Sequence, residues 1–114
     1  MHELSLTQTL MENVLDHAEG KDVQTIHLKI GLLSCVDGRA IQTCFDAVKP
    51  RLTQLHQAAL EVETCRPKAT CRDCTRQFLL NLIGEPCQCG SLNYALEGGE
   101  ELTISSISFY SVSV

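Results

Sequence analysis

Four cysteines lie close together in the second half of the chain. Two residues separate Cys71 from Cys74, and one residue separates Cys87 from Cys89. Two thiolates from each of two turns can surround one tetrahedral zinc ion at Zn–S distances of about 2.3 Å. No histidine lies between the first and the last of these cysteines. A closed shell of four thiolates leaves no coordination position for water. The spacing therefore predicts a structural zinc site rather than a catalytic one.

The second cysteine pair is shorter than the usual C-x2-C arrangement, because only Gln88 separates its two cysteines. Which four sulfurs bind the metal is therefore open at this point. Cys65, six positions before Cys71, is the alternative ligand if one cysteine of the second pair does not reach the ion. Cys35 and Cys44 need no metal, because free cysteine behaves as a small buried apolar residue.

The chain terminus offers a second, different set of ligands. The imidazole and backbone nitrogens of His2 and the α-amine of Met1 can close five- and six-membered chelate rings on one ion. Nitrogen ligands in a planar arrangement suit Ni(II) or Cu(II). Any chain that begins Met-His carries the same groups, so a terminus without metal is the alternative. The remaining histidines are expected to be solvated surface residues: His17, His27 and His56.

The composition excludes several classes of protein. The 114 residues have a net charge of −5 and an aromatic content of 4%. Binding to nucleic acid needs clustered Lys and Arg, which this chain lacks. There is no apolar run of about 20 residues for a membrane span and no signal-peptide pattern at the N-terminus. These features predict a cytoplasmic protein whose seven cysteines stay reduced.

Hydrophobic periodicity predicts the elements that position these residues. Steps of three and four residues predict helices over residues 3–19 and 38–49, the second capped by Asp37 and ended by Pro50. Alternation predicts strands over residues 23–33, 58–65 and 102–109. Between Cys65 and residue 93 only residues 77–83 have a strand pattern.

This order predicts an α/β (α+β) fold: a small mixed three-stranded sheet with two helices and an inserted zinc-ribbon-like module. Residues 1–65 and 98–114 would form the α/β domain, and residues 66–97 the zinc-binding domain. So small an insert cannot supply a sufficient core of its own, so metal binding would provide its folding energy.

Three segments are together similar to the HypA/HybF family of nickel metallochaperones, which act in maturation of nickel–iron hydrogenase. They are MHELSL at the N-terminus, residues 29–36, and Cys71-x2-Cys74 with the later Cys89-Gly90-Ser91. The similarity covers essentially the whole chain in order and length. It implies that transported Ni(II) binds through the Met1 amine and His2, with Glu3 adjacent, and that two cysteine pairs hold structural Zn(II).

The resemblance also implies a protein that is not an enzyme and that works with a HypB-type GTPase and the nickel–iron hydrogenase large-subunit precursor. Some members serve urease maturation. No nucleic-acid or membrane partner is expected, and the chain would be a monomer or a weak homodimer. The family's second pair is normally C-x2-C, and this chain departs from it. We expect Cys87 to bind nevertheless, since a one-residue shift is within the tolerance of a loop. The alternative function is a zinc-ribbon interaction module that transports no metal.

Overall fold

The computed structural model describes residues 3–110, and its packing divides the chain into two compact units. Unit 1 contains the chain up to Leu28, then Val36–Glu63, and the chain from Thr103 onward. Unit 2 contains Lys29–Cys35 and Thr64–Leu102. A compact unit need not be an independently folding domain, so the domain boundaries predicted from the sequence stay a prediction. Within residues 3–110, no helix has the length and apolar content needed to cross a membrane.

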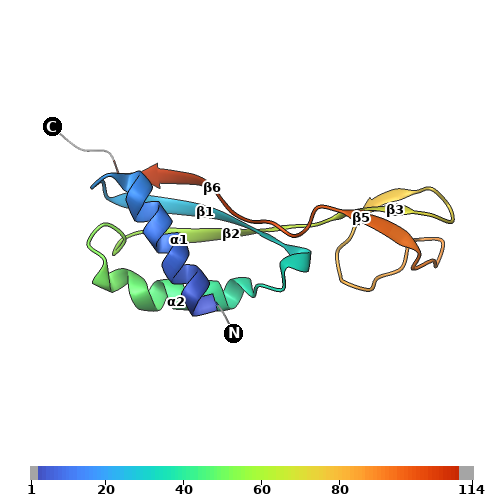
Figure 1. The fold of residues 1–114 in the computed structure, drawn as a ribbon, viewed down its shortest axis with the longest axis horizontal. Coiled ribbons are helices and arrows are strands. Elements are labelled where there is room, and N and C mark those ends of the chain that lie inside the picture. Colours follow the sequence, from blue (N-terminus) through green and yellow to red (C-terminus); the bar gives the residue numbers. More distant parts are fainter. Residues whose placement is uncertain (1–2, 111–114) are drawn as a thin grey trace. The chain divides into compact units, whose positions relative to one another are not determined.

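A three-stranded sheet and two helices form the α/β part of the fold (Figure 1). The sheet has the strand order β2-β1-β6. Its strands and helices are α1 (Glu3–Ala18), β1 (Val23–Gly31), α2 (Gly38–Val48), β2 (Ala59–Cys65) and β6 (Leu102–Phe109), with short 3-10 turns η1 (Leu32–Ser34) and η2 (Lys49–Arg51). The two helices and three strands predicted from periodicity are confirmed to within about two residues at most ends.

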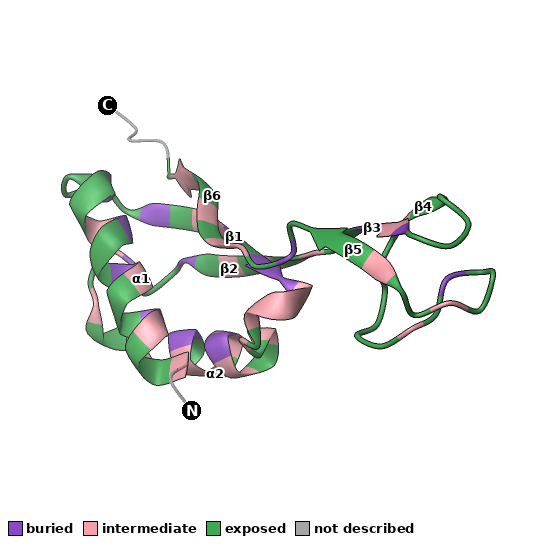
Figure 2. Cartoon of the chain, turned by 45° about the vertical axis from the view of Figure 1, so that its right-hand side comes forward, coloured by how far each residue is buried: buried purple, intermediate pink, exposed green. Residues whose placement is uncertain are grey.

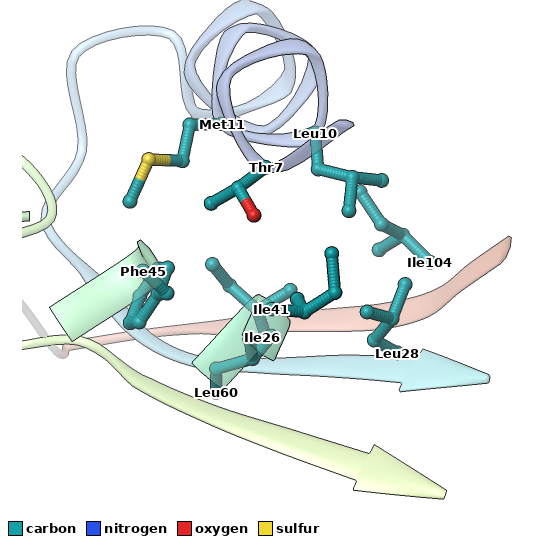
Figure 3. A pocket seen from close by; sticks show the side chains of 9 residues that line it. All are labelled: Thr7, Leu10, Met11, Ile26, Leu28, Ile41, Phe45, Leu60 and Ile104. Atoms are coloured by element: carbon teal, nitrogen blue, oxygen red, sulfur yellow. The ribbon is translucent and has the colours of Figure 1, made fainter. Parts of the chain in front are cut away.

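The sheet is mixed. Hydrogen bonds join Gly31 to Glu101 and Asp22 to Tyr110, so residue numbers rise along β1 while they fall along β6, as in an antiparallel pair. Strands β1 and β2 point in the same direction, with α2 in the connection between them (Figure 3). A parallel pair needs such a crossover connection. The predicted mixed three-stranded sheet is therefore present.

The core of unit 1 lies between the helices and one face of this sheet. Buried positions recur along one side of α1 and of α2 (Figure 2). Its buried members are Met11, Val14, Ala18, Val23, Ile26, Phe45, Leu55 and Ala58. The three- and four-residue steps that predict the first helix also place Leu4 on its inward face, but Leu4 is 51% exposed, so that part of the prediction is wrong. It lies in the first turn of the helix, ahead of the first buried position at Thr7.

A small cavity of about 10 Å³ remains between α1, α2 and the sheet (Figure 3). Its lining is apolar apart from Thr7. The Thr7 hydroxyl donates a hydrogen bond of 2.6 Å to the carbonyl oxygen of Glu3, so its donor is satisfied within the helix. A space of this size holds one water at most. The cavity is therefore a packing gap in the core and not a ligand site.

Unit 2 is built on a second small sheet with the strand order β4-β3-β5. Its strands are β3 (Lys68–Cys71), β4 (Gln77–Leu79) and β5 (Tyr94–Glu97), and both pairs are antiparallel. The sequence pattern predicted only one strand here, over residues 77–83, and missed β3 and β5. Strands of four residues are too short to show alternation, and their pairing depends on residues distant in the sequence.

A close backbone contact explains why Lys29–Cys35 belongs to unit 2. The amide of Gly31 donates to Glu101 and the amide of Leu33 donates to Gly99, both at 2.6 Å. A Cβ atom on Gly31 would lie 2.2 Å from the Gly99 carbonyl oxygen, and one on Gly99 would lie 2.8 Å from the Pro67 ring. Only glycine allows backbones to approach this closely. The end of β1 is thereby fixed to the turn that leads into β6.

Candidate metal centre

The first cysteine pair lies in a tight turn between β3 and β4, over residues 71–76, which we call the first turn. The amide of Cys71 donates to the Arg76 carbonyl at 2.8 Å, and the amide of Thr75 donates back to the Cys71 carbonyl at 3.0 Å. Thr75, directly after Cys74, has a left-handed backbone with φ 64°. These two hydrogen bonds close the turn, and both cysteine side chains extend from it.

The second pair lies in a shorter turn of the same design, over residues 87–91, which we call the second turn. The amide of Cys87 donates to the Ser91 carbonyl at 2.9 Å, and the amide of Gly90 donates back to the Cys87 carbonyl at 2.7 Å. Gly90, directly after Cys89, has φ 89°. The missing residue of the second pair is therefore absorbed by a turn that is one residue tighter and is closed in the same way.

The two turns bring four sulfurs together in what we call the four-cysteine cluster: Cys71, Cys74, Cys87 and Cys89. All four Sγ atoms lie within 4.8 Å of one another. The Cys71–Cys89 and Cys74–Cys87 Sγ distances are 3.7 and 3.5 Å, whereas a regular tetrahedron with metal–sulfur bonds of 2.3 Å has edges of about 3.8 Å. Disulfide sulfurs would be about 2 Å apart, so the four cysteines of the cluster are not joined by disulfides. The donor set and its spacing thus fit a tetrahedral thiolate-bound ion.

Cys65, the alternative ligand, is half-buried and is not among the sulfurs that meet. Among the described residues, the four-cysteine cluster is the one group of three or more Cys, His, Asp or Glu side chains close enough to hold an ion. Cys71 and Cys87 are buried, and Cys74 and Cys89 are exposed. The shortened pair therefore reaches the cluster without help from Cys65.

Without an ion, the environments of Cys71, Cys74 and Cys89 separate the pKa values of these three thiols. A backbone hydrogen bond from Cys74 is the largest influence on Cys71 and lowers the pKa of its thiol to about 6. Although a backbone hydrogen bond from Ser91 acts in the opposite direction, desolvation and the neighbouring cysteines raise the pKa of Cys89 to about 12. At Cys74 a backbone hydrogen bond from Arg76 is outweighed by the bond with Cys87 and by desolvation, so its pKa is raised. A bound cation would favour ionisation of these thiols, since the thiolate is the form of cysteine that binds a metal.

Side chains outside the cysteines join the two turns, and sequence reasoning did not identify them. The Ser91 hydroxyl donates to the Asp73 carboxylate, and the Arg76 guanidinium donates to the side-chain oxygen of Gln88. Beside them, Arg72 donates to the Asn93 side chain at 3.2 Å. Their positions next to the cysteines could have indicated these residues in the sequence, but only the folded structure shows which of them form hydrogen bonds with one another.

The candidate nickel residues at the N-terminus are described only in part. Met1 and His2 lie outside the described residues. Glu3 is the first residue of α1 and is half-buried. Its carboxylate lies in the first helical turn, where a negative charge is favoured by the helix dipole.

The remaining described histidines and cysteines lie outside the four-cysteine cluster. His17 and His56 are exposed and contact backbone carbonyl oxygens of Asn13 and Thr53 through Nδ1, as expected for surface residues. His27 is partly exposed and lies 3.1 Å from the Glu61 carboxylate. The expectation that Cys35 is buried is wrong, because this residue follows η1 in a left-handed conformation, with φ 61°, and faces solvent. Cys44 is half-buried on α2.

Comparisons with known proteins agree over the whole chain. A family model described as HypA, hydrogenase/urease nickel incorporation, metallochaperone, matches residues 1–109. The hydrogenase maturation factor HypA of Geotalea uraniireducens is 39% identical over 94% of this chain and 97% of its own length. That of a Nostoc species is 38% identical over the full length of both chains.

Two solved structures share the fold. The solution structure of the Ni metallochaperone HypA from Helicobacter pylori has a TM-score of 0.66 at 22% identity, over 98% of this chain and 100% of that one. A second solution structure of a HypA protein has a TM-score of 0.65 at 23% identity, over 96% and 97% of the two chains. At this identity the likeness concerns the fold alone, whereas the family match rests on sequence. This chain therefore belongs to the HypA family of nickel-incorporating metallochaperones for hydrogenase and urease.

Proposed function

We propose that this protein carries Ni(II) on its N-terminus and delivers it to the precursor of the nickel–iron hydrogenase large subunit. Met1 and His2 would bind the ion, with Glu3 beside them, and the four-cysteine cluster would hold structural Zn(II). The observation that carries the proposal is the match to a nickel-incorporation family from residue 1 onward. The relatives' shared name, hydrogenase maturation factor, supports hydrogenase rather than urease as the recipient.

The start of α1 suits a cargo site that must release its ion. Backbone nitrogens at the start of α1 would serve as ligands once deprotonated. The positive end of the helix dipole disfavours a cation there. Deprotonated amide nitrogens and the Glu3 carboxylate offset that repulsion with negative charge. The balance of these effects favours moderate affinity, which a carrier requires.

The four-cysteine cluster suits a resident ion instead of a transported one. Two of its sulfurs are buried, and all four come from turns closed by backbone hydrogen bonds. Four thiolates at these separations select a tetrahedral ion such as Zn(II), and they leave no open position for substrate or water. Zinc would cross-link the two turns, and the protein would act without catalysing a reaction. A HypB-type GTPase in the cytoplasm is the partner that the proposal includes.

Titration of an untagged protein with Ni(II) tests the carrier role directly. Isothermal titration calorimetry should show one equivalent of nickel binding that is lost in His2→Ala and in a protein extended by one residue before Met1. His17→Ala is the matched control, because His17 lies exposed in the last turn of α1 and contacts a backbone carbonyl. Unchanged nickel binding in both the His2 variant and the extended protein would overturn the proposal and leave a zinc-bearing interaction module.

Delivery requires its own measurement. Protein loaded with nickel should transfer the ion to the hydrogenase large-subunit precursor, detected as nickel that co-purifies with the precursor after the two are separated. Transfer should be faster than from a chelator of equal affinity, because a carrier hands over its ion within a complex. Equal rates from the protein and the chelator would contradict delivery while leaving nickel binding intact.

A further inference from the structure

The shortened second turn raises the question of what holds it against the first turn. The chain that leads into it from β4 is exposed in its middle, because Leu82 and Ile83 are 69% and 67% exposed and no strand runs between Leu79 and Cys87. One side-chain bond holds its end, from the Tyr94 hydroxyl to the Glu85 carbonyl at 2.7 Å. After the second turn the chain is better held, because Tyr94 in β5 pairs with Cys71 in β3. Strand pairing therefore fixes one side of the second turn only.

Ser91 connects the second turn to the first through its side chain. Its hydroxyl donates to the carboxylate of Asp73, which lies between the two cysteines of the first turn. The same oxygen accepts the backbone amide of Asn93 at 3.0 Å. A hydroxyl has one proton and two lone pairs, so both of its functions are used here. One side chain thus joins the first turn, the second turn and the start of β5.

Gln88 makes a second connection, from the point where the residue is missing. It is the single residue between Cys87 and Cys89, and its side-chain oxygen accepts from the Arg76 guanidinium. The backbone carbonyl of Arg76 closes the first turn by accepting from the Cys71 amide at 2.8 Å. Hydrogen bonds from a charged donor are stronger than neutral ones. Gln88 is therefore hydrogen-bonded to Arg76, the residue whose carbonyl closes the first turn.

We propose that the Asp73–Ser91 and Arg76–Gln88 pairs are positioning contacts that hold the two turns at metal-binding distance, and that Arg76 and Gln88 compensate for the missing residue of the second pair. The inference rests on the proposed structural metal site. Neither contact involves sulfur or metal, so both can form before the ion binds. They lower the ordering required on binding, and this raises affinity and slows release.

Zinc affinity and dissociation test this role in two variants, Ser91→Ala and Gln88→Ala. Each should weaken zinc binding by about 2- to 10-fold, the range expected when one side-chain hydrogen bond is removed. Dissociation into excess chelator should accelerate in parallel. The matched control is Asn81→Ala, because Asn81 accepts from the Arg66 guanidinium in the same unit but outside both turns. Its affinity and dissociation rate should equal those of the unaltered protein.

Two further variants separate positioning from general damage to the fold. Ser91→Thr keeps the hydroxyl, and the exchanged pair Arg76→Gln with Gln88→Arg keeps an arginine–amide contact. Both should recover most of the lost affinity. Cobalt-substituted protein gives a second readout: the visible bands of a tetrahedral Co(II)–thiolate centre should be altered in Gln88→Ala and restored in the exchanged pair.

The outcomes distinguish this inference from the function on which it rests. Zinc affinity and dissociation unchanged in both Ser91→Ala and Gln88→Ala would overturn the positioning role and leave the zinc site standing. Failure of the unaltered protein to bind Zn(II) or Co(II) at the cysteines would overturn the metal site itself. Weakened binding without recovery in Ser91→Thr and in the exchanged pair would also count against positioning, since it would indicate general loss of structure.

Discussion

Thr75 and Gly90 occupy equivalent positions in the two cysteine turns. Each directly follows the second cysteine of its pair, has a positive φ of 64° or 89°, and donates its amide proton to the carbonyl of the first cysteine. The two turns therefore share one backbone arrangement even though their cysteine spacings differ. The equivalence also reveals a difference in strain, because a β-branched residue is unfavourable at positive φ and glycine is not.

Exchanging these residue types should change stability in opposite directions. Thr75→Gly should stabilise the zinc-bound protein by about 1 kcal/mol, reduced by loss of the hydroxyl contact with the Cys74 carbonyl. Gly90→Ala should destabilise it by about 1 kcal/mol from the backbone alone, since no atom lies within 4 Å of the added Cβ. Urea unfolding of the zinc-bound protein measures both. Shifts of the same sign would show that the two positions are not equivalent.

Cysteine substitutions should separate the four-cysteine cluster from Cys65. Zinc content, measured by mass spectrometry of the purified protein, should fall from one equivalent toward zero in Cys74→Ser and Cys89→Ser, because removing one thiolate opens the shell. Cys65→Ser should keep the full equivalent, since its sulfur lies outside the cluster. Zinc loss in Cys65→Ser with retention in Cys89→Ser would contradict the assignment of ligands.

Metal binding at the cluster should release protons and strengthen as pH rises. The raised pKa values of Cys74 and Cys89, the latter about 12, keep both thiols protonated at neutral pH, so each must lose its proton to bind. The protons released by these two thiols alone make the apparent zinc affinity fall at least about a hundredfold per pH unit as pH decreases from 9 to 7. Below the pKa of about 6 of Cys71, its proton steepens the fall further.

Calorimetry in two buffers with different ionisation enthalpies measures this proton release. At pH 7.5 the difference in observed enthalpy should correspond to at least two protons per zinc, one each from Cys74 and Cys89. Release of fewer than one proton would mean that the metal-free cluster is already ionised, contrary to the mutual influence of the neighbouring thiols.

The contact between Gly31 and Gly99 should be intolerant of any side chain. Gly31 has φ −73°, which any residue adopts, so the cost of Gly31→Ala is steric: its Cβ would lie 2.2 Å from the Gly99 carbonyl oxygen. We expect destabilisation of about 2–3 kcal/mol in thermal or urea unfolding. Lys29→Ala, at an exposed position of the same strand, should change stability by less than about 0.5 kcal/mol. Equal stability of the two variants would contradict the close contact.

Elements whose burial pattern follows from residues close together in the sequence could be predicted from the sequence. Alternation of Ile26, Leu28 and Ile30 with polar neighbours indicated β1, and all three are buried. The Asp37 side chain accepts the Arg39 amide at 2.9 Å, as its position before a helical pattern indicated. In both cases residues close in the sequence create the signal, because a strand and a helix impose periods of two and 3.6 residues.

Strands β3 and β5 and the exposed position of Cys35 could not be predicted in this way. The four residues of β3 form a strand because they pair with β4 on one side and β5 on the other, across separations of 7–11 and 23–29 residues. Cys35 directly follows a 3-10 turn and itself adopts a left-handed backbone, and no periodic pattern in the sequence indicates this.

The metal centre was likewise predictable only in part. The sequence by itself determined that four cysteines in two pairs could hold a tetrahedral ion, since ligand type and spacing are local properties. It left Cys65 as a possible substitute for one of them. Only the tertiary structure decided which sulfurs meet, because their separation depends on the pairing of Cys71 with Tyr94 and on how each turn closes. The pairing of Cys71 with Tyr94 is a non-local contact, and no local sequence pattern reveals it.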